Sequence, residues 1–538
     1  MKFFDRKSII ELLNRRVVDL KEGYRQNLAL IGPEFIGKTS ILEEFLSQLN
    51  DERIVPIYLP LAEADFNHFA DKLVGRLLFN FLKNKKTGGE ENIEILLEQA
   101  QKLIPSTCLQ IRRVRQNLEK DKHWEAYRDL LSLPEIFEQE TGSFCLIILD
   151  EFQNLEEFDL PNIFQELGKK IMVQKQSIYI VTSSARSKAQ KILTEKLSLL
   201  FGNFEVVEVG PFSIRTSLEF IEEAFKEHHL EKSYKNFLVD FTGGHPFYLS
   251  AICERVIAAV QQEGQKNIFL NVLIDSLEQI LFDKWGLINQ HFSRIINSLG
   301  TKKGKGFAAE ILLKIAGGLN KLPEISDSFT TNKSLVPAKL NQLVESRILT
   351  KNGNLFCIID KLFAFWLRYV YHRRLSSLRD NAADLSASFK NDLRQKINSF
   401  VQISGNELEE RIIDLLQSFD NELFQLNGKK HRLPNFSAIH PLNFNGSTSQ
   451  NLKGLIAQTS GDLWAITYKE GMILDTDVTA FLSSTKDLNQ RVTRRVIISI
   501  NEIETNARLR ALQEKMWIWN ITDLNFVLNL YGKPYIVK

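Results

Sequence analysis

The chain has 538 residues, of which 44% are hydrophobic and 25% are charged, values typical of a soluble globular protein with about three domains. Its 68 basic and 66 acidic side chains leave a formal net charge of +2, which excludes a strong overall field that would draw the protein to nucleic acid or to an anionic membrane. We also expect no membrane association, because no uncharged apolar run approaches the length of a span and the first residues lack a signal-peptide core.

The cysteines argue for a reduced, cytoplasmic protein. Cys108, Cys145, Cys253 and Cys357 are far apart and lie in or beside apolar runs, as buried free thiols do. The sequence has neither a Cys-x-x-Cys pair nor a His-Glu-x-x-His helix, and its nine histidines are scattered. A metal site built from these residue types is therefore not expected.

The first predicted element is a helix at residues 9–18, where apolar residues recur with a period of 3.6 and Ser8 is a candidate cap. A buried strand, Asn27–Ile31, follows and leads into a loop with a glycine at each end. A second amphipathic helix opens at Lys38. This is the Walker A pattern, G-x-x-x-x-G-K-[ST], in its strand–loop–helix context.

The spacing of this pattern suits phosphate binding, because the loop N–H groups and the positive end of the helix can surround an anion. Lys38 would contact the β- and γ-phosphates, and the Thr39 hydroxyl would coordinate Mg²⁺. The alternative is a chance loop between a core strand and a helix. The predicted nucleotide-binding residues are Gly32, Pro33, Glu34, Phe35, Ile36, Gly37, Lys38, Thr39 and Ser40.

The arm that precedes the first helix, Phe4-Asp5-Arg6, has two interpretations. It lies across the adenine base, with Arg6 as a nucleotide-binding residue, or it is the ordinary start of a capped helix. Beyond the loop, residues 54–59 are predicted to form a strand, 66–82 a helix, 83–91 a polar surface loop and 92–140 a series of helices.

A second motif closes the apolar run at residues 144–149, which is typical of a central strand buried on both faces. Asp150 and Glu151 follow it, at the strand end where parallel sheets place their ligands. This resembles a Walker B strand, with Asp150 on Mg²⁺ and Glu151 polarising the attacking water. The alternative is that the two carboxylates cap the next helix.

Hydroxyl side chains end the next strand, predicted at residues 177–181. The central one, Ser183, is a candidate catalytic residue that would hydrogen-bond the γ-phosphate or the attacking water, although serine-rich strand ends also form ordinary turns. Arg186 is a candidate phosphate contact, within the chain or across a subunit interface, or else a solvated surface arginine. One further strand is predicted at residues 204–209.

Residues 213–299 are predicted to be helical, with one joint at Gly243-Gly244-His245-Pro246. Residues 307–368 have the element order of a winged helix, ending in a hairpin around Asn352-Gly353. Its third helix carries few basic residues, so packing within the protein is favoured over reading a DNA groove. After a polar joint at residues 379–384, an amphipathic helix at 405–416 precedes strands at 436–439, 463–468 and 496–500, a helix at 507–515 and a strand at 516–519.

Taken in order, the Phe4-Asp5-Arg6 arm, the Walker A loop, Leu149-Asp150-Glu151, the hydroxyl-rich strand end and the Gly-Gly-His-Pro joint resemble the archaeal-type ATPases. That family belongs to the STAND class and is related to origin-recognition AAA+ proteins. The resemblance covers about residues 1–370. It implies an α/β P-loop core at residues 1–212, a helical lid at 213–300 in which His245 and Pro246 contact the nucleotide, and a winged helix at 301–378. One departure is Glu34-Phe35, where the family often has basic residues.

Residues 379–538 resemble the restriction-endonuclease-like α/β domain that some of these ATPases carry. The helix with Glu407, Glu409 and Glu410 matches its first acidic position, but Thr467-Tyr468-Lys469 has threonine where the family has an acidic residue. Because a nuclease needs carboxylates there to hold the metal, activity is not expected. A rescue by Asp475 and Asp477 is the open alternative.

The sequence therefore predicts an ATP- and Mg²⁺-dependent molecular switch in which hydrolysis releases a nucleotide-fixed arrangement of domains. The main alternative is an ATP-gated effector that binds or processes DNA through the winged helix and the C-terminal domain. A third is a scaffold whose ATP is structural. Candidate partners are a second copy of the chain, another protein, or DNA.

Overall fold

The computed structural model of the protein describes all residues except 1–2, 62–64, 88–90, 198–203, 301, 377–381, 445–450, 460, 487, 489–490 and 538. The chain forms two compact units. The first is Met1–Phe212 with His245–Phe247, and the second is Ser213–Gly244 with Tyr248–Lys538.

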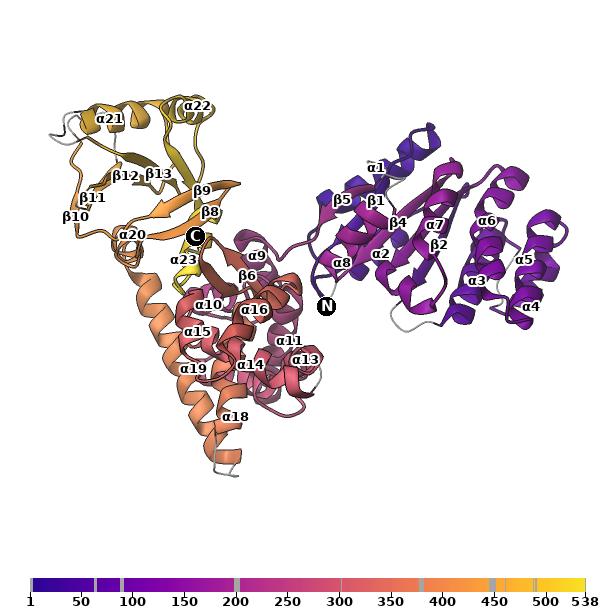
Figure 1. Cartoon of the computed structure of the whole chain (residues 1–538), viewed down its shortest axis with the longest axis horizontal. Coiled ribbons are helices and arrows are strands. Elements are labelled where there is room, and N and C mark those ends of the chain that lie inside the picture. The colour runs from indigo at the N-terminus through magenta and orange to yellow at the C-terminus, as the bar shows by residue number, and fades with distance from the viewer. Residues whose placement is uncertain are drawn as a thin grey trace. The chain divides into compact units, whose positions relative to one another are not determined.

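The first unit is built on a five-stranded parallel sheet in the order β2-β3-β4-β1-β5 (Figure 1). Because β4 lies between β3 and β1, the carboxyl ends of these three strands meet at one edge of the sheet. The strands are β1 (Asn27–Ile31), β2 (Ile54–Pro60), β3 (Phe144–Asp150), β4 (Ser177–Ser183) and β5 (Phe204–Glu208).

Alternate residues of each strand face two different cores, since successive side chains of a strand point to opposite faces. Leu28 and Leu30 of β1 pack in the core that includes α1 and α2, whereas Ala29 and Ile31 pack in the core that includes α3 to α7. This two-sided burial explains the continuous apolar runs in the sequence. The helices are α1 (Lys7–Lys21), α2 (Lys38–Gln48), α3 (Phe66–Asn84), α4 (Ile93–Ala100), α5 (Pro105–Glu119), α6 (His123–Thr141) and α7 (Ile163–Val173).

Shorter elements complete this unit: η1 (Phe152–Phe158), α8 (Arg186–Lys191) and η2 (Ile192–Lys196). The predicted strands and helices are confirmed, with ends that differ by a few residues. The predicted cap is wrong, because Ser8 lies inside α1 and the N-cap position belongs to Arg6, whose side chain makes no capping bond.

The second unit begins with five helices, in the region that was predicted to be helical throughout. Gly243 ends α10 in the left-handed conformation, φ 60°, and Pro246 opens α11, where its fixed φ suits a first turn. The helices are α9 (Ile214–Ala224), α10 (Lys232–Thr242), α11 (Pro246–Glu263), α12 (Leu270–Leu281) and α13 (Leu287–Ser298).

Three α-helices, one short 3₁₀ helix and a hairpin then follow. The α-helices and the hairpin have the order predicted for a winged helix, an identity that stays a prediction. They are α14 (Lys302–Ala316), α15 (Leu322–Asp327), η4 (Lys333–Leu335), α16 (Val336–Glu345), β6 (Leu349–Asn352) and β7 (Leu355–Ile358). The hairpin turn is at Gly353-Asn354, one residue later than predicted. A connected helical run continues with α17 (Lys361–Trp366), η5 (Leu367–Tyr371) and α18 (His372–Ser376). The next described helix is α19 (Ala382–Gly405).

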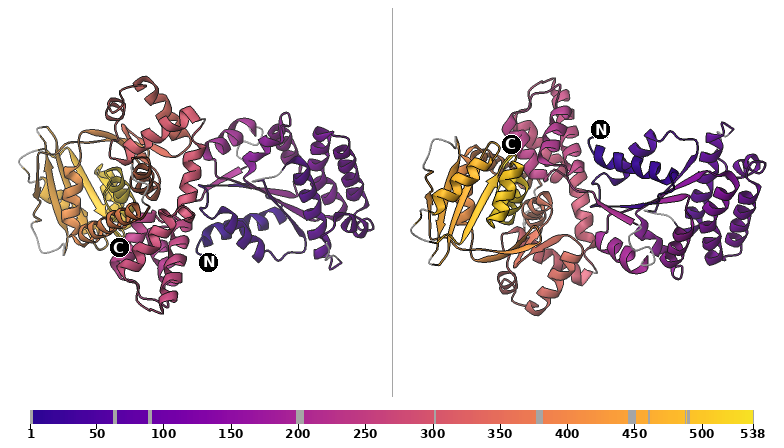
Figure 2. Two further views of the ribbon diagram at one scale, coloured as in Figure 1. Left: turned by 90° about the horizontal axis from the view of Figure 1, so that it is seen from below. Right: turned by 90° about the horizontal axis from the view of Figure 1, so that it is seen from above.

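The C-terminal part of this unit is a mixed sheet in the order β10-β11-β12-β13-β14, in which β12, β13 and β14 run parallel (Figures 1 and 2). One face packs in a core with α21 and α22, and the other with α20, α23 and the β8–β9 hairpin. The elements are α20 (Leu408–Gln417), β8 (Glu422–Leu426), β9 (Lys429–Leu433), β10 (Ala438–Pro441), β11 (Lys453–Gln458), β12 (Leu463–Lys469), α21 (Asp475–Lys486), β13 (Arg494–Ser499), α22 (Thr505–Gln513), β14 (Trp517–Asn520) and α23 (Ile521–Leu530).

Several of these elements were not anticipated: α19, the β8–β9 hairpin, β11, α21 and α23. The hairpin carries a readable signal, because Asn427 and Gly428 join its strands and both are left-handed, with φ 50° and 76°, as a two-residue hairpin turn requires. In the part of the chain that the structure describes, no helix is long and apolar enough to cross a bilayer.

Candidate functional site

The loop between β1 and α2 depends on its two glycines for different reasons. At Gly32 the backbone N–H donates to the Ser183 carbonyl at 3.1 Å, and a Cβ atom would lie 2.2 Å from the Val209 carbonyl oxygen. Gly32 is therefore required by the close approach of the chain after β5. Gly37 is the N-cap of α2 with φ 97°, which is left-handed backbone that other residues rarely adopt.

Lys38 is the first residue of α2, and its ammonium group is held inside this loop. Its Nζ donates to the carbonyl oxygens of Gly32 at 3.0 Å and Pro33 at 2.9 Å. It also lies 3.4 Å from Glu151 Oε1. The side chain is only 4% exposed, so a buried cation faces the loop at the positive end of a helix, as an anion site requires.

Asp150, the last residue of β3, meets Thr39, the second residue of α2. Thr39 Oγ1 donates to Asp150 Oδ2 at 2.9 Å, and Tyr58 Oη donates to the same oxygen at 2.7 Å. Thr182 Oγ1 donates to Asp150 Oδ1. Burial and the bond to Asp150 raise the pKa of Tyr58, so Tyr58 stays a donor at neutral pH.

The pairing of Thr39 with Asp150 fits a Mg²⁺ site in its donor chemistry. Mg²⁺ is held in such sites by one or two protein oxygens, with water and phosphate oxygens in the remaining positions. A hydroxyl and a carboxylate oxygen 2.9 Å apart, next to the phosphate-binding loop, supply those protein oxygens. Within the described ranges, no group of three or more His, Cys, Asp and Glu residues forms an all-protein metal cluster elsewhere.

Glu151 sits one residue beyond β3 in the left-handed conformation, φ 58°, and its carboxylate turns toward Lys38. Its Oε2 accepts from Ser184 N at 2.8 Å, Ser184 Oγ at 2.7 Å and Gln153 Nε2 at 2.8 Å. Burial opposes ionisation, but the Lys38 charge and these hydrogen bonds together lower the pKa of Glu151. The carboxylate is thus ionised at neutral pH and firmly oriented.

The hydroxyl side chains at the end of β4 make two kinds of contact, one with the backbone that follows and one with the acidic pair Asp150 and Glu151. Ser183 Oγ accepts from Ala185 N at 3.1 Å, and Thr182 Oγ1 accepts from Glu151 N at 2.9 Å. The contacts with the acidic pair thus belong to Thr182 and Ser184, whereas the sequence analysis selected Ser183. The period of two along a strand, which places Thr182 and Ser184 on the same side, is the signal that separates them.

Tyr58 was also missed by the sequence analysis. It is the fifth residue of β2 and pairs in register with Ile148 of β3, so it lies beside the strand that ends in Asp150. The predicted residues Lys38, Thr39, Asp150 and Glu151 all meet in one place.

The remaining predicted residues lie around this centre. The Arg6 guanidinium donates to the Gly210 carbonyl at 2.5 Å and lies 4.8 Å from the centre of the Phe212 ring, so it joins the N-terminal arm to the segment after β5. Arg186 pairs with Glu208. His245 and Pro246 belong to a short segment of the first unit, in which the Phe247 ring stacks on Phe35 with centroids 4.8 Å apart.

The nuclease-like positions form a separate group in the second unit. Lys469 Nζ lies 2.8 Å from Asp477 Oδ2, and that oxygen also accepts from Leu474 N. Thr467 Oγ1 donates to the Lys453 carbonyl at 3.0 Å, so its hydroxyl is engaged with the backbone. Glu407 and Glu409 pair instead with the Lys453 ammonium, at 3.0 and 3.6 Å.

Comparison with known proteins gives a family match for the N-terminal part of the chain. Residues 3–252 match the family model described as an ATPase domain predominantly from Archaea. No curated protein matches the chain.

Solved structures that resemble the chain include three archaeal and bacterial proteins. The Walker-type ATPase PABY2304 of Pyrococcus abyssi is 19% identical over 68% of this chain and 96% of its own, with a TM-score of 0.46. The ORC2 protein of Aeropyrum pernix, in its ADPNP–ADP complexes, is 11% identical over 74% and 96%, with a TM-score of 0.43. The RuvB Holliday junction branch migration motor of Thermotoga maritima is 13% identical over 68% and 96%, with a TM-score of 0.34.

Proposed function

We propose that residues 3–252 form an ATPase domain that makes this protein a molecular switch of the STAND/AAA+ type, which binds and hydrolyses ATP and couples its nucleotide state to domain rearrangement or partner binding. One observation carries the proposal. Lys38 with Glu151 at 3.4 Å, and Thr39 with Asp150 at 2.9 Å, converge beside the glycine-edged loop although more than a hundred residues separate them in sequence.

In this proposal the loop binds the phosphates. Its N–H groups and the start of α2 surround the anion, and Lys38 exchanges the Gly32 and Pro33 carbonyls for phosphate oxygens. This exchange is favourable, because an ammonium–phosphate hydrogen bond is stronger than one to a neutral carbonyl. Mg²⁺, held by Thr39 and Asp150, would neutralise charge that develops on the phosphates.

Glu151 is the proposed group that orients water. Its carboxylate is ionised and held by Ser184 and Gln153, so one oxygen can accept a hydrogen bond from water in a defined direction. Once Lys38 turns to phosphate, Glu151 loses a neighbouring cation and becomes a better proton acceptor. The exchange of Lys38 partners thus couples nucleotide binding to activation of the base.

The coupling to a switch has one structural support. His245–Phe247 belongs to the first unit, whereas the residues on both sides of it belong to the second. Within the first unit Phe247 stacks on Phe35, a residue of the phosphate-binding loop. We propose that a change in this loop on hydrolysis is transmitted through that stack to α11, which begins at Pro246.

The experiment uses Lys38→Ala and Glu151→Gln in the full chain, with Glu43→Gln as a control on the exposed face of α2. Lys38→Ala should abolish ATP binding in calorimetry. Glu151→Gln should bind ATP but hydrolyse it about 10²- to 10⁴-fold more slowly, the usual contribution of a general base. An undiminished hydrolysis rate in either variant would refute the proposal, and bound ATP without turnover in the unmutated protein would favour the structural scaffold.

For the alternative, an ATP-gated effector that processes DNA, we propose that the C-terminal domain has no nuclease activity. The Lys469–Asp477 pair and the backbone-bonded Thr467 support this, since neither leaves a set of free carboxylates for a metal. Incubation of the chain with DNA, ATP and Mg²⁺ or Mn²⁺ should leave the DNA intact. Cleavage that Asp477→Asn abolishes would favour the effector.

A further inference from the structure

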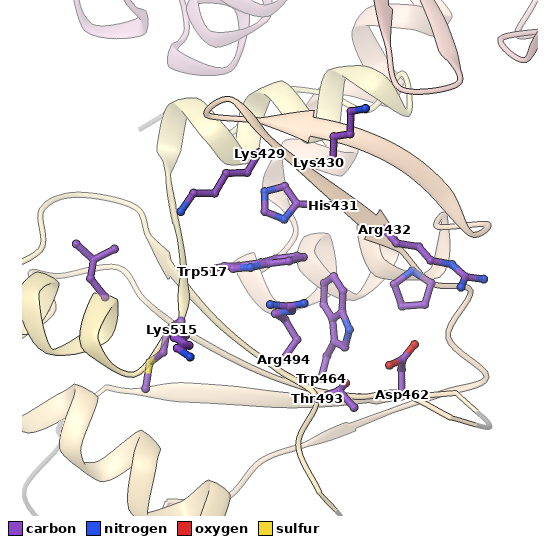
Figure 3. Close-up of a pocket in the computed structure, with 13 residues that line it drawn as sticks. Lys429, Lys430, His431, Arg432, Asp462, Trp464, Thr493, Arg494, Lys515 and Trp517 are labelled. Atoms are coloured by element: carbon purple, nitrogen blue, oxygen red, sulfur yellow. The ribbon is translucent and has the colours of Figure 1, made fainter.

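The second unit contains a cavity of about 710 Å³ that the proposed function does not use (Figure 3). It lies under the β8–β9 hairpin, where β12, β13 and β14 begin. Trp464, Arg494 and Trp517 are the second, first and first residues of these parallel strands. Lys469 is the last residue of β12, so the cavity and the Lys469–Asp477 pair are at opposite ends of the sheet.

The cavity lining carries an excess of positive charge. It includes five cationic side chains, Lys429, Lys430, Arg432, Arg494 and Lys515, and one carboxylate, Asp462. All five cationic residues are exposed. In the described part of the chain, none of the five forms an ion pair within 4.0 Å.

Such a cluster is unusual in a chain whose formal net charge is only +2. Unpaired cations around one concave site repel one another and concentrate a positive potential there. An anionic ligand with several separated charges would relieve that repulsion. The cluster spans both the hairpin strand β9 and the starts of β13 and β14, so the charges are spread along the cavity.

The floor of the cavity is aromatic and rigidly arranged. The rings of Trp464 and Trp517 have centroids 5.1 Å apart at 85°, and the His431 ring lies 4.1 Å from Trp517. The Arg494 guanidinium carbon lies 4.3 Å from the Trp517 centroid. Figure 3 shows Trp517 between His431 and Arg494. Burial, together with the charges of Arg494 and Lys429, lowers the pKa of His431, so the imidazole is neutral at pH 7.

We infer that this cavity binds a segment of single-stranded nucleic acid. Backbone phosphates would pair with Lys429, Lys430 and Lys515, and an unpaired base would lie against the Arg494–Trp517 layer. A positively charged groove with aromatic side chains on which bases can stack is the general means by which proteins hold an unpaired strand. A duplex does not fit this chemistry, because its bases are already stacked on one another.

Two other occupants are less well matched. The phosphate of a free mononucleotide is satisfied by two or three donors, which leaves part of the cluster unpaired. An acidic peptide would neutralise the charge, but the acidic side chains that do so carry no flat ring for the aromatic floor, whereas every nucleotide carries a base. The inference does not depend on the ATPase proposal, since the cavity is formed entirely by the second unit.

The test measures binding of a fluorescein-labelled oligothymidylate of about 12 nucleotides, within the usual site size for such proteins, by fluorescence anisotropy with the full chain. Binding should weaken steeply between about 50 and 200 mM salt. The double variant Lys429→Ala/Lys430→Ala should bind at least about tenfold more weakly. Its log–log salt slope should be smaller by about 1.4, or about 0.7 for each phosphate that is no longer neutralised.

The matched control is Lys486→Ala/Arg508→Ala, which removes the same charge from exposed positions of α21 and α22 and should leave affinity and slope unchanged. Trp517→Phe keeps a ring but reduces stacking area, and it should weaken binding by about fivefold or more. Lys38→Ala should bind the oligonucleotide as the unmutated protein does, which separates this site from the nucleotide loop.

Three results would overturn the inference. One is that the cavity variant and the control variant weaken oligonucleotide binding equally, or that neither variant weakens it. Another is displacement of the oligonucleotide by thymidine monophosphate at a concentration similar to that of competing oligonucleotide. The third is equal or tighter binding of a duplex of the same sequence, or of a polyglutamate of matched charge.

Discussion

Glu138 of α6 offers a sharp test of the energetics of the first unit, because its carboxyl group is buried against β4. The side chain is 8% exposed and accepts a hydrogen bond from Ser177 Oγ. Burial raises the pKa of Glu138 from 4.5 to about 7, against the opposing effects of Ser177 and the Arg25 charge. Between about pH 4.5 and 7, Glu138 therefore keeps a proton in the folded state that it has released in the unfolded state.

The direction in which stability changes with pH follows from this difference in proton binding. Stability contributed by Glu138 is complete below about pH 4.5, falls as the pH rises to about 7 and stays reduced above it. A difference of about 2.5 pKa units corresponds to about 3 kcal/mol at most. Glu138→Gln removes this loss but must accommodate an amide NH₂, which costs about 1 kcal/mol or more when unsatisfied. We expect a net gain of about 1–2 kcal/mol at pH 8 and none at pH 5.

The control is Glu140→Gln, two residues later on the same helix. The Glu140 carboxylate accepts from the backbone N–H groups of Ser106 at 2.8 Å and Thr107 at 2.9 Å, at the N-terminus of α5. Burial opposes its ionisation, but these bonds lower its pKa. Loss of this carboxylate in Glu140→Gln should lower the free energy of unfolding by about 1 kcal/mol, the usual value of a helix cap.

The assay is hydrogen–deuterium exchange of peptides from β3 and β4, compared with the unmutated protein at the same pH. Exchange should slow by about tenfold in Glu138→Gln at pH 8, since 1.4 kcal/mol is a factor of ten, and should quicken in Glu140→Gln. Shifts of the same sign in both variants, or an unchanged rate in Glu138→Gln at pH 8, would contradict the reasoning.

Two further predictions concern one residue each. Gly32→Ala should destabilise the first unit by at least about 3 kcal/mol and abolish ATP binding, because its Cβ would lie 2.2 Å from the Val209 carbonyl oxygen. The control Gly210→Ala should leave the thermal unfolding midpoint nearly unchanged, because its Cβ would meet nothing within 4 Å. Equal midpoints for the two variants would count against this prediction. Burial and the Arg294 charge lower the pKa of His291 to about 4, so the second unit should lose stability as the pH falls from about 6.5 to 4. Amide exchange in α13 should show this loss in the unmutated protein and a flatter profile in His291→Gln; parallel profiles would contradict it.

Much of the first unit was predictable because its signals are local. The phosphate-binding loop is one continuous segment, Gly32–Thr39, and its glycines, lysine and threonine act through backbone geometry that a short motif specifies. The strands could be recognised because burial on both faces leaves continuous apolar runs. In the second unit β8, β9 and β11 include polar and charged residues, so their sequences carried weaker signals.

The sequence by itself therefore determined the nucleotide loop, the acidic end of β3 and the alternation of strands and helices around them. Only the tertiary structure decided which hydroxyls meet Asp150, because Tyr58 and Thr182 reach it from neighbouring strands whose order, β2-β3-β4-β1, differs from their order in the chain. The same reason applies to the basic cavity. Its lining comes from segments near residues 430, 463, 494 and 516, and charges so far apart in sequence become one binding surface only when the sheet brings the starts of its strands together.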